Sequence, residues 1–211
     1  SVRWAEDFAG FIFDLMEGRE PPCVIEIHPP FSDYTDMQGL VESYSRFENR
    51  IVTVYPQTEI LLENRCGSIY RGGRFVVSKV EDMEELCRHI EGSGLKLKIA
   101  CDIPQIYTAH NVKKDDAYIR LLERIKELRA YIGGVHLWGK RRTPQGRKVA
   151  HCGDLNSYFE GNAALKEAFL SAFAECFGDG VVRKMVLEVN SGQEDMSSIL
   201  EDLRGVGVSF I

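Results

Sequence analysis

Strand-like and helix-like segments alternate along this chain, and the alternation limits the possible folds more than any other feature of the sequence. Short apolar runs that break at Gly, Pro or Asn are expected to be strands, at residues 23–28, 59–63, 95–102, 134–138, 185–190 and 206–211. Longer segments with apolar residues at helical spacing are expected to be helices, at residues 2–18, 36–54, 80–91, 115–130, 163–177 and 194–203. Such alternation implies βα units around a parallel sheet, so we expect one α/β domain over residues 1–211.

The number of strands bears on which α/β architecture is present. About six strands can be counted, whereas a (β/α)₈ barrel needs eight and typically about 250 residues. This chain has 211 residues and opens on a helix with no strand before it. If the chain is a (β/α) TIM-type barrel with parallel strands, it lacks the first one or two βα units. An open doubly wound sheet and a shortened barrel completed by a partner chain are the alternatives.

Composition sets broad limits on the function. Apolar residues make up 44% of the chain and charged residues 27%, which suits a globular domain with a sizeable core. The net charge of −6 gives no general affinity for nucleic acid, although a local basic patch could still supply it. No run is long and apolar enough to cross a membrane, and no signal-peptide pattern opens the chain. The six cysteines have neither zinc-knuckle nor redox spacing, so we expect reduced thiols in a cytoplasmic protein.

Polar side chains that can bind metal recur at the ends of the expected strands. They are His28, Glu63, Asp102, His136 and Glu188. In parallel α/β folds the carboxyl ends of the strands carry the active site, so these side chains should converge there. Converging carboxylates and imidazoles must pair with each other or hold a cation, because bare buried charges are too costly. Three carboxylates with two histidines form a set of nitrogen and oxygen ligands suited to zinc or manganese.

The same strand ends resemble those of a known family, the xylose isomerase-like TIM barrels, which include sugar isomerases, sugar epimerases and endonuclease IV-type abasic-site nucleases. The segment Ile27-His28-Pro29-Pro30 is similar to the family's strand ending in His-Pro-Gly, and residues 62–67 are similar to its Leu-Glu-Asn-Thr-Ala-Gly segment. Residues 101–105 match an Asp-Thr-x-His segment in the Asp alone, residues 135–137 match His-Leu-Asn-Asp in the His alone, and residues 187–189 match the last glutamate. The five motifs occur in the right order.

The resemblance implies a metal site whose ligands are Glu63, Asp102, His136 and Glu188. Single-metal isomerases and epimerases of the superfamily use such a set, with two glutamates as acid and base, here Glu63 and Glu188. His28 would be an extra ligand or a substrate contact. The nuclease pattern is less complete, because Gln105 stands where a zinc-binding His is expected and no Asp-x-His occurs in residues 145–155.

Residues near these strand ends are candidates for binding a substrate. Planar Arg side chains bind phosphate bidentately, and aromatic rings stack on a sugar or a base. The candidates are Arg65, Arg71, Gln105, Trp138, Lys140, Arg141, Arg142 and His151. The sequence thus predicts a divalent-metal-dependent isomerase or epimerase acting on a small carbohydrate or sugar phosphate, in a chain that could form a homo-oligomer. An endonuclease IV-like zinc phosphodiesterase acting on abasic DNA is the first alternative, and a non-catalytic degenerate barrel is the second.

Overall fold

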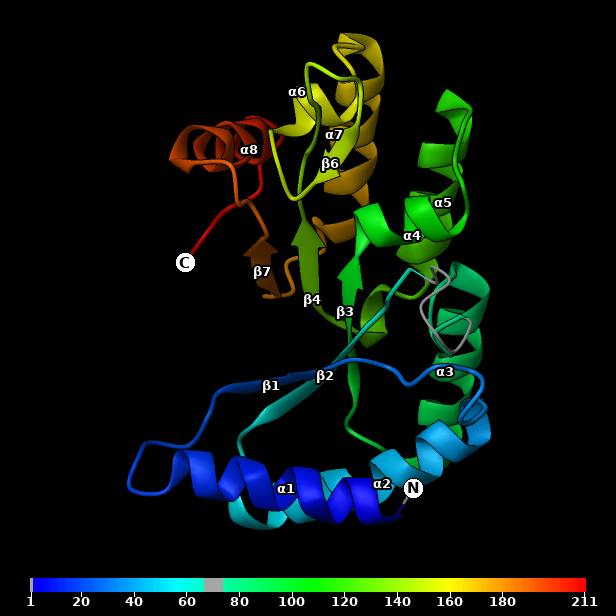
Figure 1. Cartoon of the computed structure of the whole chain (residues 1–211), viewed down its shortest axis with the longest axis vertical. Helices are drawn as coiled ribbons and strands as arrows, with labels where there is room; N and C mark the ends of the chain where they lie inside the picture. Colours follow the sequence, from blue (N-terminus) through cyan, green and yellow to red (C-terminus); the bar gives the residue numbers. More distant parts are fainter. Residues whose placement is uncertain (1, 67–73) are drawn as a thin grey trace. The chain divides into compact units, whose positions relative to one another are not determined.

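The computed structural model describes residues 2–66 and 74–211, and it has the α/β class expected from the sequence (Figure 1). The helices are α1 Val2–Met16, α2 Met37–Val54, α3 Val80–Ser93, α4 Ile103–Ala109, α5 Asp115–Glu127, α6 Leu155–Tyr158, α7 Ala163–Phe177 and α8 Gln193–Gly205, with a 3₁₀ turn at Arg129–Tyr131. The strands are β1 Val24–Ile27, β2 Glu59–Glu63, β3 Lys98–Asp102, β4 Ile132–Leu137, β5 Lys140–Arg142, β6 Lys148–Ala150 and β7 Lys184–Leu187. No helix among the described residues has both the length and the apolar character needed to span a bilayer.

Five of these strands form one sheet in the order β1-β2-β3-β4-β7, and β5 and β6 form a separate pair. The order in the larger sheet follows the order in the chain. A doubly wound sheet reverses its strand order at a switch point, whereas strands in a TIM-type barrel follow one another in sequence. The observed order therefore disfavours the doubly wound alternative, and the TIM-type barrel stays a prediction.

The chain divides into two compact units, which are described separately. Unit 1 comprises Ser1–Ala109 and Tyr131–Gly134, and unit 2 comprises His110–Ala130 and Val135–Ile211.

In unit 1, the strands β1, β2 and β3 are parallel. Ile25 lies opposite Ile60, and Leu62 lies opposite Ile99. The residues Ile60, Leu61 and Leu62 are all at most 4% exposed, so side chains on both faces of β2 are buried. Parallel strands covered on both faces form such continuous apolar runs, which explains why the β2 sequence does not alternate.

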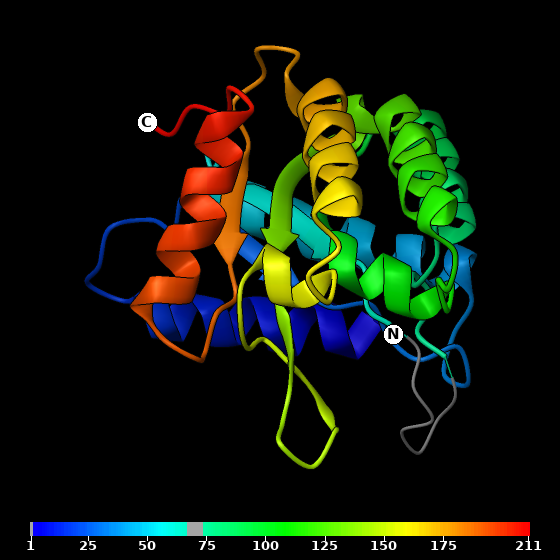
Figure 2. The same ribbon diagram turned by 90° about the horizontal axis from the view of Figure 1, so that it is seen from above.

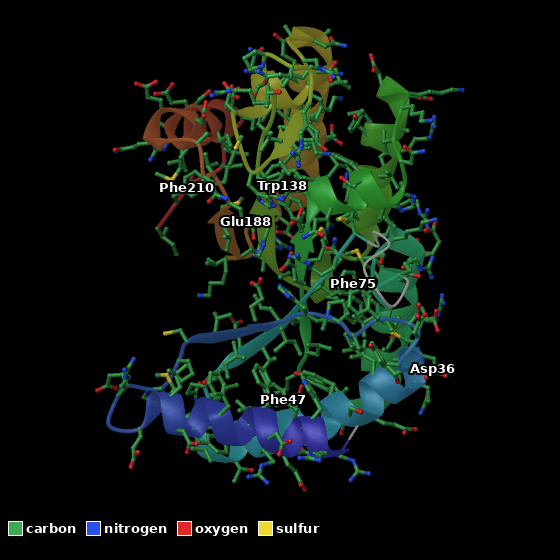
Figure 3. All side chains as sticks on the ribbon, viewed as in Figure 1. Asp36, Phe47, Phe75, Trp138, Glu188 and Phe210 are labelled. Atoms are coloured by element: carbon green, nitrogen blue, oxygen red, sulfur yellow. The ribbon has the colours of Figure 1, made fainter. Side chains whose placement is uncertain are left out.

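The helices α1 and α2 of unit 1 lie side by side (Figure 1). The ring of Phe47, which is fully buried and labelled in Figure 3, lies 5.3 Å from the rings of both Trp4 and Phe8. Asp36, at the start of α2, caps that helix by accepting a hydrogen bond from the N–H of Gly39 at 2.9 Å. Burial of a side chain such as Phe47 stabilises the fold by about 1.5–3 kcal/mol.

In unit 2, helices α5 and α7 pack against each other (Figure 2). Leu122 and Ile125 on α5, and Phe169 and Phe173 on α7, are at most 1% exposed. These apolar side chains recur at intervals of three and four residues, so each helix presents one apolar face to the core.

The basic segment after β4 forms an antiparallel hairpin. Arg141 on β5 lies opposite Val149 on β6. The two backbones approach closely at the base of the hairpin, where a Cβ atom added to Gly139 would lie 2.1 Å from the carbonyl oxygen of Gly153. Glycine at position 139 therefore permits the close approach that closes the hairpin, which Figure 2 shows projecting outward.

The strand predicted at residues 206–211 is wrong, because these residues form no strand. The N–H groups of Val206 and Val208 both donate to the carbonyl of Leu203, at 3.2 and 3.0 Å. Two backbone donors of this apolar segment are therefore used to close the C-terminal end of α8.

Candidate metal centre

The residues predicted to bind metal lie at or next to strand ends. Glu63 and Asp102 are the last residues of β2 and β3, and His136 is the next-to-last residue of β4. These three are at most 2% exposed. Glu188 follows β7 directly and is 27% exposed in its side chain. Buried carboxylates need hydrogen-bonding or ionic partners, so the neighbours of each side chain limit its chemical role.

In unit 1, the carboxylate of Glu63 is surrounded by donors. Its Oε1 accepts hydrogen bonds from Nε2 of Gln105 at 2.8 Å and from Nη1 of Arg65 at 3.1 Å. Its Oε2 lies 2.8 Å from Nε2 of His28, which directly follows β1. These contacts fix the orientation of Glu63 and bring three predicted site residues to it.

Asp102 is held by both its backbone and its side chain. Its N–H donates to Oδ1 of Asn64 at 2.9 Å, and its carbonyl accepts from Nδ2 of Asn64 at 3.0 Å. Its own Oδ1 accepts from the backbone N–H of Gln105 at 2.9 Å, which caps the start of α4. Asn64 is fully buried, and sequence reasoning gave it no role. The signal that could have found it is an Asn directly after a strand-end carboxylate, because a side-chain amide there can pair with a neighbouring backbone.

In unit 2, the carboxylate of Glu188 lies between two imidazoles. Its Oε1 is 3.2 Å from Nδ1 of His136, and its Oε2 is 3.1 Å from Nδ1 of His151. The His151 ring lies 4.4 Å from the ring of Trp138. Trp138 and Glu188 are both labelled in Figure 3, directly after β4 and β7. This half of the candidate site therefore contains a partly exposed carboxylate with two groups that can exchange a proton.

His151 has an unusual backbone conformation, with a φ angle of 57°. A left-handed conformation costs a residue other than glycine about 1–2 kcal/mol. The carbonyl of His151 accepts a hydrogen bond from the N–H of Asn190 at 2.8 Å, which ties the hairpin to the segment after Glu188. The strained conformation thus belongs to a residue that is fixed beside a candidate catalytic carboxylate.

The predicted cationic residues of the hairpin are paired with carboxylates or aromatic rings. The ammonium of Lys140 lies 5.2 Å from the ring centroids of both Trp138 and Tyr158. The guanidinium of Arg141 is 2.6 Å from Asp195 Oδ1.

At the far end of the hairpin, Arg142 and Lys148 both contact Glu160, the former at 3.1 Å. The hydrogen bond from Lys148 is the largest cause of the lowered pKa of Glu160. The side chains of Arg141, Arg142 and Lys148 are about half exposed, at 53%, 53% and 52%. Arg71, another predicted substrate contact, lies outside the described residues.

The four predicted ligands form one group. Glu63, Asp102, His136 and Glu188 each offer one ligand atom, and these atoms all lie within 4.8 Å of one another. Three carboxylates and one imidazole suit a divalent ion such as zinc or manganese. The buried group could therefore hold a metal ion, while the role of each residue as a ligand stays a prediction.

Comparisons with known proteins place the fold but no family. No protein-family profile matches the chain, and no curated protein matches it. Among solved structures, the chain is similar to one described as "The crystal structure of AsfvAP:AG", with a TM-score of 0.61 and 16% identity. The match covers 96% of this chain and 67% of that chain. At this identity the likeness shows a shared fold.

Proposed function

We propose that this chain is a divalent-metal-dependent phosphodiesterase that acts on DNA. The observation that carries the proposal is the group of Glu63, Asp102, His136 and Glu188 within a fold similar to AsfvAP, an AP endonuclease-like protein. The sequence favoured a carbohydrate isomerase, and the fold likeness supports the nuclease alternative better.

The donor set supports a chemical role for each half of the group. A bound zinc or manganese ion would lower the pKa of a water molecule and polarise a phosphoryl oxygen. Glu63 and Asp102 would hold the ion, because hydrogen bonds from Gln105 orient both carboxylates. Glu188 would accept a proton from this water molecule and pass it to His151. Nδ1 of His151 lies 3.1 Å from Oε2 of Glu188.

The hairpin provides cations for a polyanionic substrate. Lys140, Arg141 and Arg142 follow β4, the strand that carries His136. Arg side chains recognise phosphates bidentately, and a phosphate can compete for guanidiniums whose present partners, Asp195 and Glu160, are surface carboxylates. The aromatic rings of Trp138 and Tyr158 add surfaces on which a base or a sugar can stack.

The proposal is tested with an oligonucleotide duplex that contains one abasic site. Purified protein loaded with zinc or manganese should cut the strand at that site, and Asp102→Asn should lose both bound metal and cleavage. Asp33→Asn, which changes an exposed aspartate in the loop before α2, is the matched control and should retain both. Stoichiometric metal without cleavage would contradict the nuclease proposal.

A single-metal isomerase or epimerase is the second candidate, and Gln105 is the observation that favours it. The amide of Gln105 donates to Glu63 at the position where the resembling nucleases carry a metal-binding His. Glu63 and Glu188 would then be the acid and base acting on a sugar or sugar phosphate. Metal-dependent exchange of a sugar's carbon-bound hydrogen with deuterated solvent, without cleavage of abasic DNA, would favour this candidate.

The non-catalytic barrel is tested by the same preparation. Elemental analysis should find metal in the wild-type protein. Absence of metal after reconstitution would instead favour the non-catalytic barrel. We propose a cytoplasmic location, which agrees with six cysteines that form no disulfide in the described residues.

A further inference from the structure

Gln105 contacts both candidate carboxylate ligands of unit 1. Its backbone N–H donates to Oδ1 of Asp102 at 2.9 Å, and its side-chain Nε2 donates to Oε1 of Glu63 at 2.8 Å. The residue is only 4% exposed. A neutral side chain therefore occupies a buried position between two carboxylates that the proposed function assigns to a metal ion.

The orientation of the Gln105 amide follows from its third partner. Its Oε1 accepts a hydrogen bond from the backbone N–H of Cys66 at 2.6 Å. A backbone N–H can only donate, so the oxygen of the amide must face Cys66 and the nitrogen must face Glu63. Gln105 is thus fixed as a donor toward Glu63.

This donor restricts how Glu63 can bind metal. A carboxylate oxygen has two lone pairs, and Oε1 of Glu63 already accepts from Gln105 and from Arg65, the latter at 3.1 Å. Its Oε2, which lies 2.8 Å from Nε2 of His28, is therefore the oxygen suited to a cation. A glutamate that bridges two metal ions with one oxygen on each ion would need both oxygens.

We propose that Gln105 is a positioning residue that restricts Glu63 to one metal-binding oxygen, so that the site takes a single divalent ion. The inference rests on the proposed metal site and deepens it, because it specifies the number of ions. An imidazole at position 105 would remove the amide donor to Glu63 and add a nitrogen ligand. Gln105→His is therefore expected to permit a second ion.

The test measures metal stoichiometry and affinity by calorimetric titration with Mn²⁺ and with Zn²⁺. The wild-type protein should bind one equivalent, and Gln105→His should bind more than one. Gln105→Met, which keeps the side-chain volume and removes both hydrogen bonds, should bind one equivalent about 10–100-fold more weakly. The EPR spectrum of bound Mn²⁺ is a second readout, because an isolated ion and an exchange-coupled pair give different spectra.

Gln38 offers a matched control. Its Nε2 donates to Oε1 of Glu42 at 2.7 Å on the exposed surface of α2, so Gln38→Met removes a similar hydrogen bond away from the candidate site. This variant should bind metal as the wild-type protein does.

Thermal melting of each variant without metal checks that it is folded, and Gln105→Glu replaces Gln105→Met if the latter is unfolded. Gln105→Glu keeps the acceptor for Cys66 and cannot donate to Glu63 when ionised, and it should change the affinity at least 10-fold in either direction.

The possible outcomes separate this inference from the proposed function. Two or more equivalents in the wild-type protein, or unchanged affinity and stoichiometry in the Gln105 variants, would overturn the role of Gln105 and leave the metal site standing. No binding to the wild-type protein would overturn the metal site and this inference together. Binding of one equivalent by the wild-type protein, with metal binding altered only in the Gln105 variants, would support both the metal site and the role of Gln105.

Discussion

The two units place their candidate ligands in different surroundings. In unit 1, Glu63 and Asp102 are almost completely buried, and Gln105 donates a hydrogen bond to each carboxylate. The side chains of Arg65 and His28 also contact the carboxylate of Glu63. In unit 2, Glu188 is partly exposed and lies between the imidazoles of His136 and His151. A buried carboxylate whose orientation is fixed by several contacts is suited to offer a ligand atom, whereas a partly exposed carboxylate between two imidazoles is suited to exchange protons. Under the proposed function, Glu63 and Asp102 would chiefly bind the metal, and Glu188 would chiefly exchange protons.

Replacing Glu63 and Glu188 in turn should have the largest effects and should separate metal binding from proton transfer. Glu188→Gln should lower kcat of the proposed cleavage by about 10²–10⁴-fold, because it removes the proton acceptor. Glu63→Gln should instead weaken metal binding by on the order of 10²-fold, because it removes an oriented ligand. Metal titration and single-turnover cleavage on the same preparations separate the two effects. Glu175→Gln, which changes an exposed glutamate on α7, is the control. Equal loss of metal in both variants would remove the distinction between the two glutamates.

The buried amide of Asn64 should matter for the stability of unit 1. Asn64→Ala leaves the N–H and carbonyl of Asp102 without their present side-chain partner, and each buried group left unsatisfied costs about 1–3 kcal/mol. We expect the free energy of unfolding to fall by about 2–4 kcal/mol. Urea denaturation measures this change. Asn49→Ala, at an exposed position on α2, should change stability by less than about 1 kcal/mol. A similar small change in Asn64→Ala would show that the amide does not hold the strand ends together.

The stability of unit 2 should depend on acidic pH through Asp179. Hydrogen bonds from Arg183, at 2.7 Å to each carboxylate oxygen, are the largest cause of the lowered pKa of Asp179. Because its pKa in the folded state lies below the ordinary value of 3.8, the stabilisation is present above pH 3.8 and is lost as the pH falls toward the folded-state pKa. Asp179→Asn should therefore lower Tm at pH 7, and the difference from the wild type should shrink below about pH 4. Thermal melts across this pH range test the expectation, and a constant difference would contradict it.

The smallest expected effect concerns the cations of the hairpin. Arg142→Gln should weaken binding of DNA only a few-fold and reduce the slope of log K against log salt concentration by about one unit if Arg142 contacts one phosphate. Fluorescence anisotropy at several salt concentrations gives this slope. Arg120→Gln, at an exposed position on α5 with its own carboxylate partner, is the matched control. An unchanged slope in Arg142→Gln would remove this arginine from the proposed DNA contact.

Several elements of the site could be predicted because they depend on local sequence patterns. The apolar run of β2 ends at Glu63, and a run of this kind indicates both a buried strand and the point where it stops. The same reasoning placed Asp102, His136 and Glu188 at or beside strand ends, and the structure groups the four. The hairpin of β5 and β6 was missed, because Lys140–Arg142 and Lys148–Ala150 are only three residues long and have no apolar run of the kind that marks the other strands.

The sequence by itself determined the α/β alternation and the residue types at the strand ends, because periodicity and chain breaks are local properties. Only the tertiary structure decided what each strand-end residue contacts. Asn64 pairs with the backbone of Asp102, and Gln105 donates to Glu63, across separations of 38 and 42 residues. Such contacts depend on strand register, since a hydrogen bond needs its partners within about 3 Å and correctly aligned. The apolar segment at residues 206–211 has a strand-like sequence, but its backbone donors close α8, because a strand also requires a partner along its edge.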